Sequence, residues 1–109
     1  MDDEAKAEAS GSRLGLASVV VGAAALVVEV GAVFLLTGAE VVGLRAGSGA
    51  LGVLGLGLML GLAAHLVGLT LGGAALGRPA DSRLLGAVGM LLNGGAVVVL
   101  MFAALLTTL

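Results

Sequence analysis

The chain of 109 residues has no cysteine, no tryptophan and no tyrosine, and it has a single histidine. Without cysteine it can form no disulfide, no thiolate-ligated zinc or iron–sulfur site and no catalytic thiol. With one histidine and no cysteine, no set of nucleophile, base and acid for hydrolysis can be assembled, so we expect no enzymatic activity. The only aromatic residues are Phe34 and Phe102, so the tryptophan and tyrosine belt common at membrane interfaces is missing.

Charge is scarce as well. Charged residues make up 11% of the chain and hydrophobic residues 60%, whereas a soluble domain has roughly 25% charged residues. So few charges cannot cover the surface of a soluble fold, and the composition indicates a membrane protein. The net charge of −2 comes mostly from the N-terminal residues. No basic patch is present, so we expect no nucleic-acid partner.

Glycine, in contrast, is abundant. The twenty glycines are interleaved with Leu, Val and Ala rather than with Ser or Pro, which excludes a flexible linker. With one proline and no three-residue period, the chain is not collagen-like. The dominance of Ala, Gly, Val, Leu and Arg would suit a GC-rich coding sequence and hints at a bacterial or archaeal source.

Three long apolar segments are separated by two short polar breaks. Residues 14–39 contain one charged residue, Glu29, whereas residues 46–77 and 84–109 contain no Asp, Glu, Lys or Arg. About 20 helical residues cross a hydrocarbon core of about 30 Å. We therefore predict an all-α integral membrane protein with three transmembrane helices that run up, down and up as one domain, residues 14–109. The predicted helices cover about residues 14–39, 50–76 and 84–109.

The first 13 residues differ in character from the rest. They carry four acids and form a polar segment that we expect to be a mobile, solvated tail. A secretory signal peptide is the competing interpretation of this tail and the first apolar segment. Such peptides have a basic start and an apolar run of about 7–15 residues. Here the tail is acidic and the run is nearly twice as long, which favours a retained transmembrane helix.

The second break, residues 77–83, has clear helix-ending and helix-starting signals. We expect Gly77 to adopt the left-handed conformation that ends many helices, and Pro79 cannot continue a helix. Asp81 or Ser82 can cap the N-terminus of the following helix. So short a connection predicts that the second and third helices are antiparallel neighbours.

The distribution of basic residues predicts the orientation. Lys6, Arg13, Arg78 and Arg83 fall on one side of the predicted membrane, and only Arg45 falls on the other. Basic residues prefer the cytoplasmic side. We therefore expect a multi-pass protein of the plasma membrane with a cytoplasmic N-terminus and an external C-terminus.

Small residues recur at steps of three and four along each predicted helix, which is the spacing of a packing face in membranes. One strongly polar residue lies on each face: Glu29, His65 and Asn93. Because such side chains are costly in lipid, we expect all three to point into protein. The predicted helix-packing glycines are Gly22, Gly57, Gly61, Gly68, Gly72, Gly86 and Gly89.

The depths of these three polar residues predict how they pair. A rise of 1.5 Å per residue places His65 and Asn93 near one level, with Glu29 roughly 7–9 Å nearer the outside. We therefore predict a His65–Asn93 hydrogen bond. A Glu29–His65 contact would need a bridging water or a shift of the helices.

Two interpretations of Glu29 stay open. Intramembrane acids often form proton or cation sites in transporters, but a protonated Glu29 could also be a structural hydrogen-bonding group. Ligation of a haem by two histidines would need a second chain, because His65 is the single histidine of this one. Glu29 and His65 alone supply too few ligands for a metal ion. We expect no cofactor and no metal.

Two classes of function follow. The first is a structural or accessory membrane protein whose helices assemble, through their small-residue faces, with a second copy or with a larger membrane partner. The second is an oligomeric proton, ion or small-solute transporter that uses Glu29 and His65. Three helices cannot easily enclose a pathway, so the second class requires an oligomer.

Overall fold

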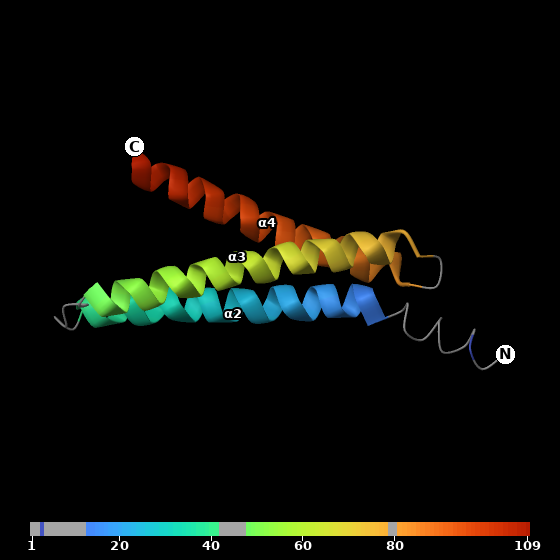
Figure 1. Cartoon of the computed structure of the whole chain (residues 1–109), viewed down its shortest axis with the longest axis horizontal. Helices are drawn as coiled ribbons and strands as arrows, with labels where there is room; N and C mark the ends of the chain where they lie inside the picture. The colour runs from blue at the N-terminus through green and yellow to red at the C-terminus, as the bar shows by residue number, and fades with distance from the viewer. Residues whose placement is uncertain (1–2, 4–12, 42–47, 79–80) are drawn as a thin grey trace.

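The computed structural model describes residues 3, 13–41, 48–78 and 81–109 and consists of three helices in this part of the chain (Figure 1). The helices are α2 (Arg13–Val41), α3 (Ser48–Leu76) and α4 (Arg83–Thr108). The observed helices begin or end one or two residues away from most of the predicted bounds. Most of the predicted tail, the first break and Pro79 lie outside the described residues.

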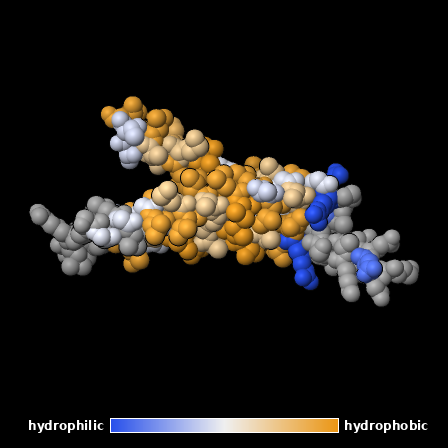
Figure 2. Space-filling view, viewed as in Figure 1, coloured by the Kyte–Doolittle hydropathy of each residue, from blue (hydrophilic) through white to orange (hydrophobic). Residues whose placement is uncertain are grey.

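All three helices are long and apolar enough to cross a membrane. The segments that meet this description contain 23, 23 and 26 residues, and about 20 are needed. Large aliphatic side chains such as Val27, Leu60 and Leu91 lie on the outside of the bundle. Figure 2 shows the resulting apolar surface along the body of the molecule, with the hydrophilic residues gathered at one end.

Each helix contacts both of the others, but the contacts are not uniform along the bundle. Helices α2 and α4 run in the same direction and α3 runs against them (Figure 1). Helix α4 lies against α3 near their connecting turn and diverges from α2 and α3 toward its C-terminus (Figure 1). The bundle therefore has a closed half, next to the α3–α4 turn, and an open half, next to the α2–α3 connection.

The end of α3 differs from the sequence prediction. Gly77 does not adopt the left-handed conformation. Its amide instead donates to the Gly73 carbonyl at 3.3 Å, and the Arg78 amide donates to the Ala75 carbonyl at 3.2 Å. These bonds extend the helix and tighten its last turn, which satisfies the terminal carbonyls without a left-handed residue.

The start of α4 is capped by Ser82. The Ser82 hydroxyl accepts a hydrogen bond from the Leu85 amide at 3.2 Å, so it satisfies one of the free amides of the first turn. The neighbouring Asp81 carboxylate accepts from the Ser82 amide at 2.8 Å. Of the two predicted caps, Ser82 is the N-cap, and Asp81 supports it from the preceding position.

The interior of the bundle is small and mostly polar. The largest fully buried side chains are His65, Asn93 and Ser18, and Glu29 is also buried. The buried apolar side chains are Ala25, Ala75 and Ala96. Many bulky aliphatic residues face outward, and glycine, alanine and a few polar side chains make up the fully buried part of the interface between the helices.

Candidate functional site: a buried polar cluster

Four polar side chains from three helices meet inside the bundle. Ser18 and Glu29 come from α2, His65 from α3 and Asn93 from α4. His65, Asn93 and Ser18 are fully buried, and Glu29 is 7% exposed. We call these four residues the polar cluster.

Asn93 is the centre of the polar cluster. Its side-chain nitrogen donates to the Ser18 carbonyl at 3.1 Å and to the Gly89 carbonyl at 2.7 Å. Its side-chain oxygen lies 2.9 Å from Nδ1 of His65, which is the pair that the depth argument predicts. Because both hydrogens of the amide nitrogen are directed at carbonyls, the orientation of the amide is fixed.

Glu29 also contacts His65 directly, contrary to the sequence prediction. Glu29 Oε2 lies 3.2 Å from His65 Nε2, with no bridging water or helix shift required. The depth estimate compared positions along the helix axes and left out the direction of the side chains. Side chains lean toward the N-terminus of their own helix. Because α2 and α3 are antiparallel, Glu29 and His65 lean toward each other and close the gap.

The hydrogen bonds determine how many protons the Glu29–His65 pair holds. The Asn93 oxygen can only accept, so Nδ1 of His65 carries a hydrogen. The Nε2–Oε2 contact then needs one more proton, either on Glu29 or on Nε2. In both arrangements the pair as a whole is neutral. With these donor and acceptor roles, the buried site would hold one shared proton and no uncompensated charge, which would be costly there.

Glycines make room for the polar side chains. A Cβ atom on Gly22 would lie 2.8 Å from both terminal atoms of the Asn93 amide, and one on Gly68 would overlap the same amide. A Cβ on Gly61 would overlap the Glu29 carboxyl group. Cβ contacts below 3.0 Å essentially never occur in proteins. These three glycines therefore leave the space that Asn93 and Glu29 fill.

The other end of the polar cluster is built around Ser18. Its hydroxyl donates to the Gly68 carbonyl at 2.6 Å, which ties α2 to α3. A Cβ on Gly72 would lie 2.9 Å from this hydroxyl, and one on Gly89 would overlap it. Gly86 packs nearby, because a Cβ there would lie 3.1 Å from the Ala75 methyl group.

Gly57 is the exception among the predicted packing glycines. A Cβ on Gly57 would meet no atom within 4 Å among the described residues. Gly57 has the same four-residue spacing to Gly61 as Gly68 has to Gly72, but it lies in the open half, where α4 has diverged from α3 (Figure 1). Among the described residues Gly57 therefore has no packing contact, and its role as a packing residue stays a prediction.

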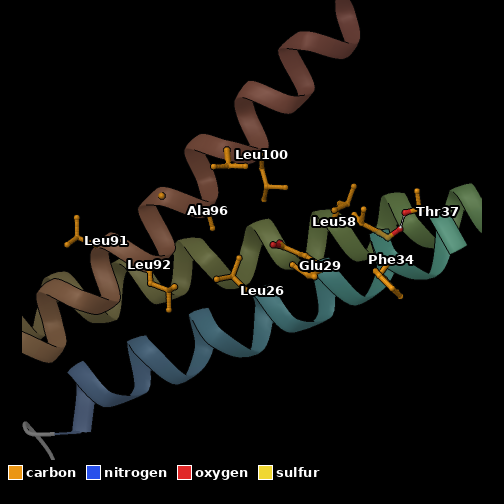
Figure 3. A pocket seen from close by; sticks show the side chains of 13 residues that line it. Leu26, Glu29, Phe34, Thr37, Leu58, Leu91, Leu92, Ala96 and Leu100 are labelled. Atoms are coloured by element: carbon orange, nitrogen blue, oxygen red, sulfur yellow. Dashed lines mark hydrogen bonds between the residues drawn. The ribbon is translucent and has the colours of Figure 1, made fainter.

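A groove opens beside the polar cluster, between α2 and α4 (Figure 3). It has a volume of about 590 Å³, and its lining is aliphatic or aromatic apart from glycine, Glu29 and Thr37. The labelled side chains in Figure 3 place Glu29 between Leu26 and Leu58, below Ala96. Glu29 Oε1 is buried and has no hydrogen-bond partner among the described residues.

The sequence analysis did not identify Ser18 as a site residue. The signal that could have found it is its spacing of eleven residues from Glu29, which is three helical turns and puts both on one face. The sequence also gave no reason to expect Asp81 to be buried at the α3–α4 turn.

Within the described ranges, no group of three or more His, Cys, Asp or Glu side chains could hold a metal ion. The side chains of the polar cluster are hydrogen-bond donors and acceptors, and Glu29 and His65 are the groups in it that can carry a proton. No family model, curated protein or solved structure matches the chain.

Proposed function

We propose that the chain is a small multi-pass membrane protein with a structural or accessory role. The observation that carries this proposal is the polar cluster, whose hydrogen bonds join all three helices within one chain. Lipid offers no hydrophobic driving force between helices, so close packing and interhelical hydrogen bonds hold such bundles together. The polar cluster supplies both the close packing and the interhelical hydrogen bonds, and it consists of polar side chains inside the bundle.

The open half supports assembly with a second copy or with a larger membrane partner. A Cβ on Gly31 or Gly38 of α2, or on Gly52 or Gly55 of α3, would meet no atom within 4 Å among the described residues. Small residues let the backbones of neighbouring helices approach closely. These glycines offer surfaces on which a further helix could pack without disturbing the polar cluster.

The location of the chain in the plasma membrane and its orientation there are part of the same proposal. The three apolar helices favour a membrane protein. Arg13 begins α2 and Arg83 begins α4, so both lie at the end of the bundle that carries the α3–α4 turn (Figure 1). By the preference of basic residues for the cytoplasmic side, this end with the N-terminus faces the cytoplasm of a plasma membrane, and the C-terminus faces outward.

Assembly can be tested by counting chains per complex with single-molecule photobleaching of labelled protein in native membranes. We expect complexes, either of several copies or of one copy with a partner that co-purifies. Gly52→Leu should break these complexes while leaving the helical content intact, and Gly73→Leu, an exposed glycine in the closed half, is the matched control. A solitary chain with no associated protein would contradict the proposal.

A second candidate function is an oligomeric proton, ion or small-solute transporter. The observation that favours it is the Glu29 carboxyl group, which lines the groove and has one oxygen without a partner. Vesicles that contain only this chain should then conduct protons or a solute, and Glu29→Gln should abolish that flux. If vesicles with correctly inserted protein show no flux, the transporter function is excluded and only the structural role remains.

A further inference from the structure

We propose that the groove between α2 and α4 binds a lipophilic primary amine, whose ammonium group docks on Glu29 and displaces the shared proton. This inference goes beyond the structural role proposed above. It depends on the shape of the groove, on the unpartnered oxygen of Glu29 and on the single proton of the Glu29–His65 pair.

The groove has the dimensions and the lining of a small-molecule site. Its volume of about 590 Å³ falls within the usual range of roughly 300–1,000 Å³ for ligand pockets. Such pockets are largely apolar with a few polar groups that orient the ligand. Here the apolar walls come from residues such as Leu26, Val33 and Leu100, and Glu29 is the single acidic group in the lining.

The position of Glu29 sets the direction of the ligand. On α2 the groove runs from Leu26 to Thr37, which is about 16 Å at 1.5 Å per residue, and Glu29 lies one turn from its Leu26 end. An ammonium group at Glu29 would therefore leave an alkyl tail lying along Val33 and Phe34. That is the direction in which α4 moves away from α2 (Figure 1, Figure 3).

The hydrogen-bonding groups favour a primary ammonium. Such a group has three N–H donors and one positive charge. The acceptors are the two oxygens of Glu29, the acidic side chain in the lining. Oε1 is buried beside Gly61 and has no hydrogen-bond partner among the described residues, and Oε2 lies 3.2 Å from Nε2 of His65, which is buried behind Glu29 and does not line the groove. Apart from Arg13 and Arg83, which begin α2 and α4, the described helices contain no lysine or arginine that could compete for the carboxylate.

The charge of the site is balanced by the loss of one proton. Glu29 faces the titratable group of His65 from α3, and α4 presents the neutral amide of Asn93. Before binding, the Glu29–His65 pair is neutral. When the ammonium binds, the proton shared by Oε2 and Nε2 leaves to solvent, Glu29 becomes a carboxylate and His65 keeps only its Nδ1 hydrogen. The site with its ligand is again neutral, so one proton is released for each amine bound.

Isothermal titration calorimetry of the purified full chain in dodecylmaltoside micelles tests this proposal, with octylamine as the probe. Titrations in two buffers that differ in ionisation enthalpy give the number of protons released. We expect saturable binding of one octylamine per chain and the release of about one proton. Octanol, with the same tail and no charge, should show only partition into the micelle.

Two variants separate the carboxyl group from the groove, and circular dichroism confirms the helical content of each. Glu29→Gln should weaken octylamine binding at least tenfold and abolish proton release. Gly95→Leu should fill the groove and weaken binding similarly with Glu29 intact, whereas Gly73→Leu, on an outer surface away from the groove, should bind as the unchanged chain does.

Unchanged binding in Glu29→Gln or in Gly95→Leu would overturn the proposal, as would octanol binding equal to that of octylamine. Binding without proton release would refute the shared-proton step and with it the proposed docking on Glu29. Should Glu29→Gln fail to fold, Gly95→Leu still decides. A chain that assembles in membranes but does not bind octylamine would refute this inference while leaving the proposed structural role in place.

Discussion

The closed and open halves of the bundle are built from nearly the same residue types, yet they pack differently. In the closed half, Gly22, Gly61 and Gly68 lie directly against polar side chains of a neighbouring helix. In the open half, Gly57, which lies on the same face of α3 as Gly61 and Gly68, meets no atom within 4 Å among the described residues. Among the residues that the structure describes, only those of the closed half include polar side chains that bond from one helix to another. Glycine permits close approach of helices, and we expect the polar cluster to decide where along the helices the approach takes place.

The sharpest way to break this comparison is to put the same large side chain into each half. Gly68→Leu should destabilise the bundle by at least about 3 kcal/mol, because its side chain would overlap the hydrogen-bonded Asn93 amide. Gly57→Leu, at the matching position of the same face in the open half, should change stability by less than about 0.5 kcal/mol, since its side chain points into open space. Unfolding in micelles with increasing dodecyl sulfate, followed by circular dichroism, measures both. Equal losses would show that the two halves do not differ.

The next effect comes from removing the centre of the polar cluster. Asn93→Ala deletes the contacts to His65, Ser18 and Gly89, and hydrogen bonds in membrane proteins contribute about 0.6 kcal/mol each on average. We expect a loss of about 2 kcal/mol in the same unfolding assay. Val98→Ala, an exposed position five residues further along α4, is the control and should have little effect. If Asn93→Ala loses no more stability than the control, the polar cluster does not hold the three helices together in the closed half.

Much of this difference could not have been predicted from the sequence. The three apolar helices follow directly from run length and scarcity of charge, and the register of His65 with Asn93 follows from rise per residue. The different packing of Gly57 and Gly68 does not follow from the sequence, because both glycines belong to the same four-residue pattern. Their difference depends on where α4 leaves α3, and that divergence has no local signal in the chain. The Glu29–His65 contact was missed because side-chain direction was not added to axial depth.

A smaller effect is expected at the α3–α4 turn, which bounds the closed half. Ser82→Ala removes the hydroxyl that accepts from the Leu85 amide and should cost about 1 kcal/mol. Ser82→Asp should restore most of the loss, because aspartate is also a strong N-cap residue. The same unfolding assay measures both variants. If Ser82→Ala matches the unchanged chain, the turn does not contribute to holding α4 against α3.

The smallest change in stability is expected for Glu29→Gln, at the level where the closed half gives way to the groove. A glutamine amide can donate to His65 Nε2 as a protonated carboxyl group does, so the helix contact is kept and stability should change by less than about 0.6 kcal/mol. The informative readout is the imidazole. Because the chain has one histidine, its ring nitrogens can be assigned without ambiguity by nitrogen-15 NMR. In Glu29→Gln the acceptor Asn93 Oδ1 and the new donor together require a neutral ring with its hydrogen on Nδ1. A hydrogen on Nε2 instead would mean that the Asn93 amide is turned the other way, and the count of one shared proton in the unchanged chain would then be wrong.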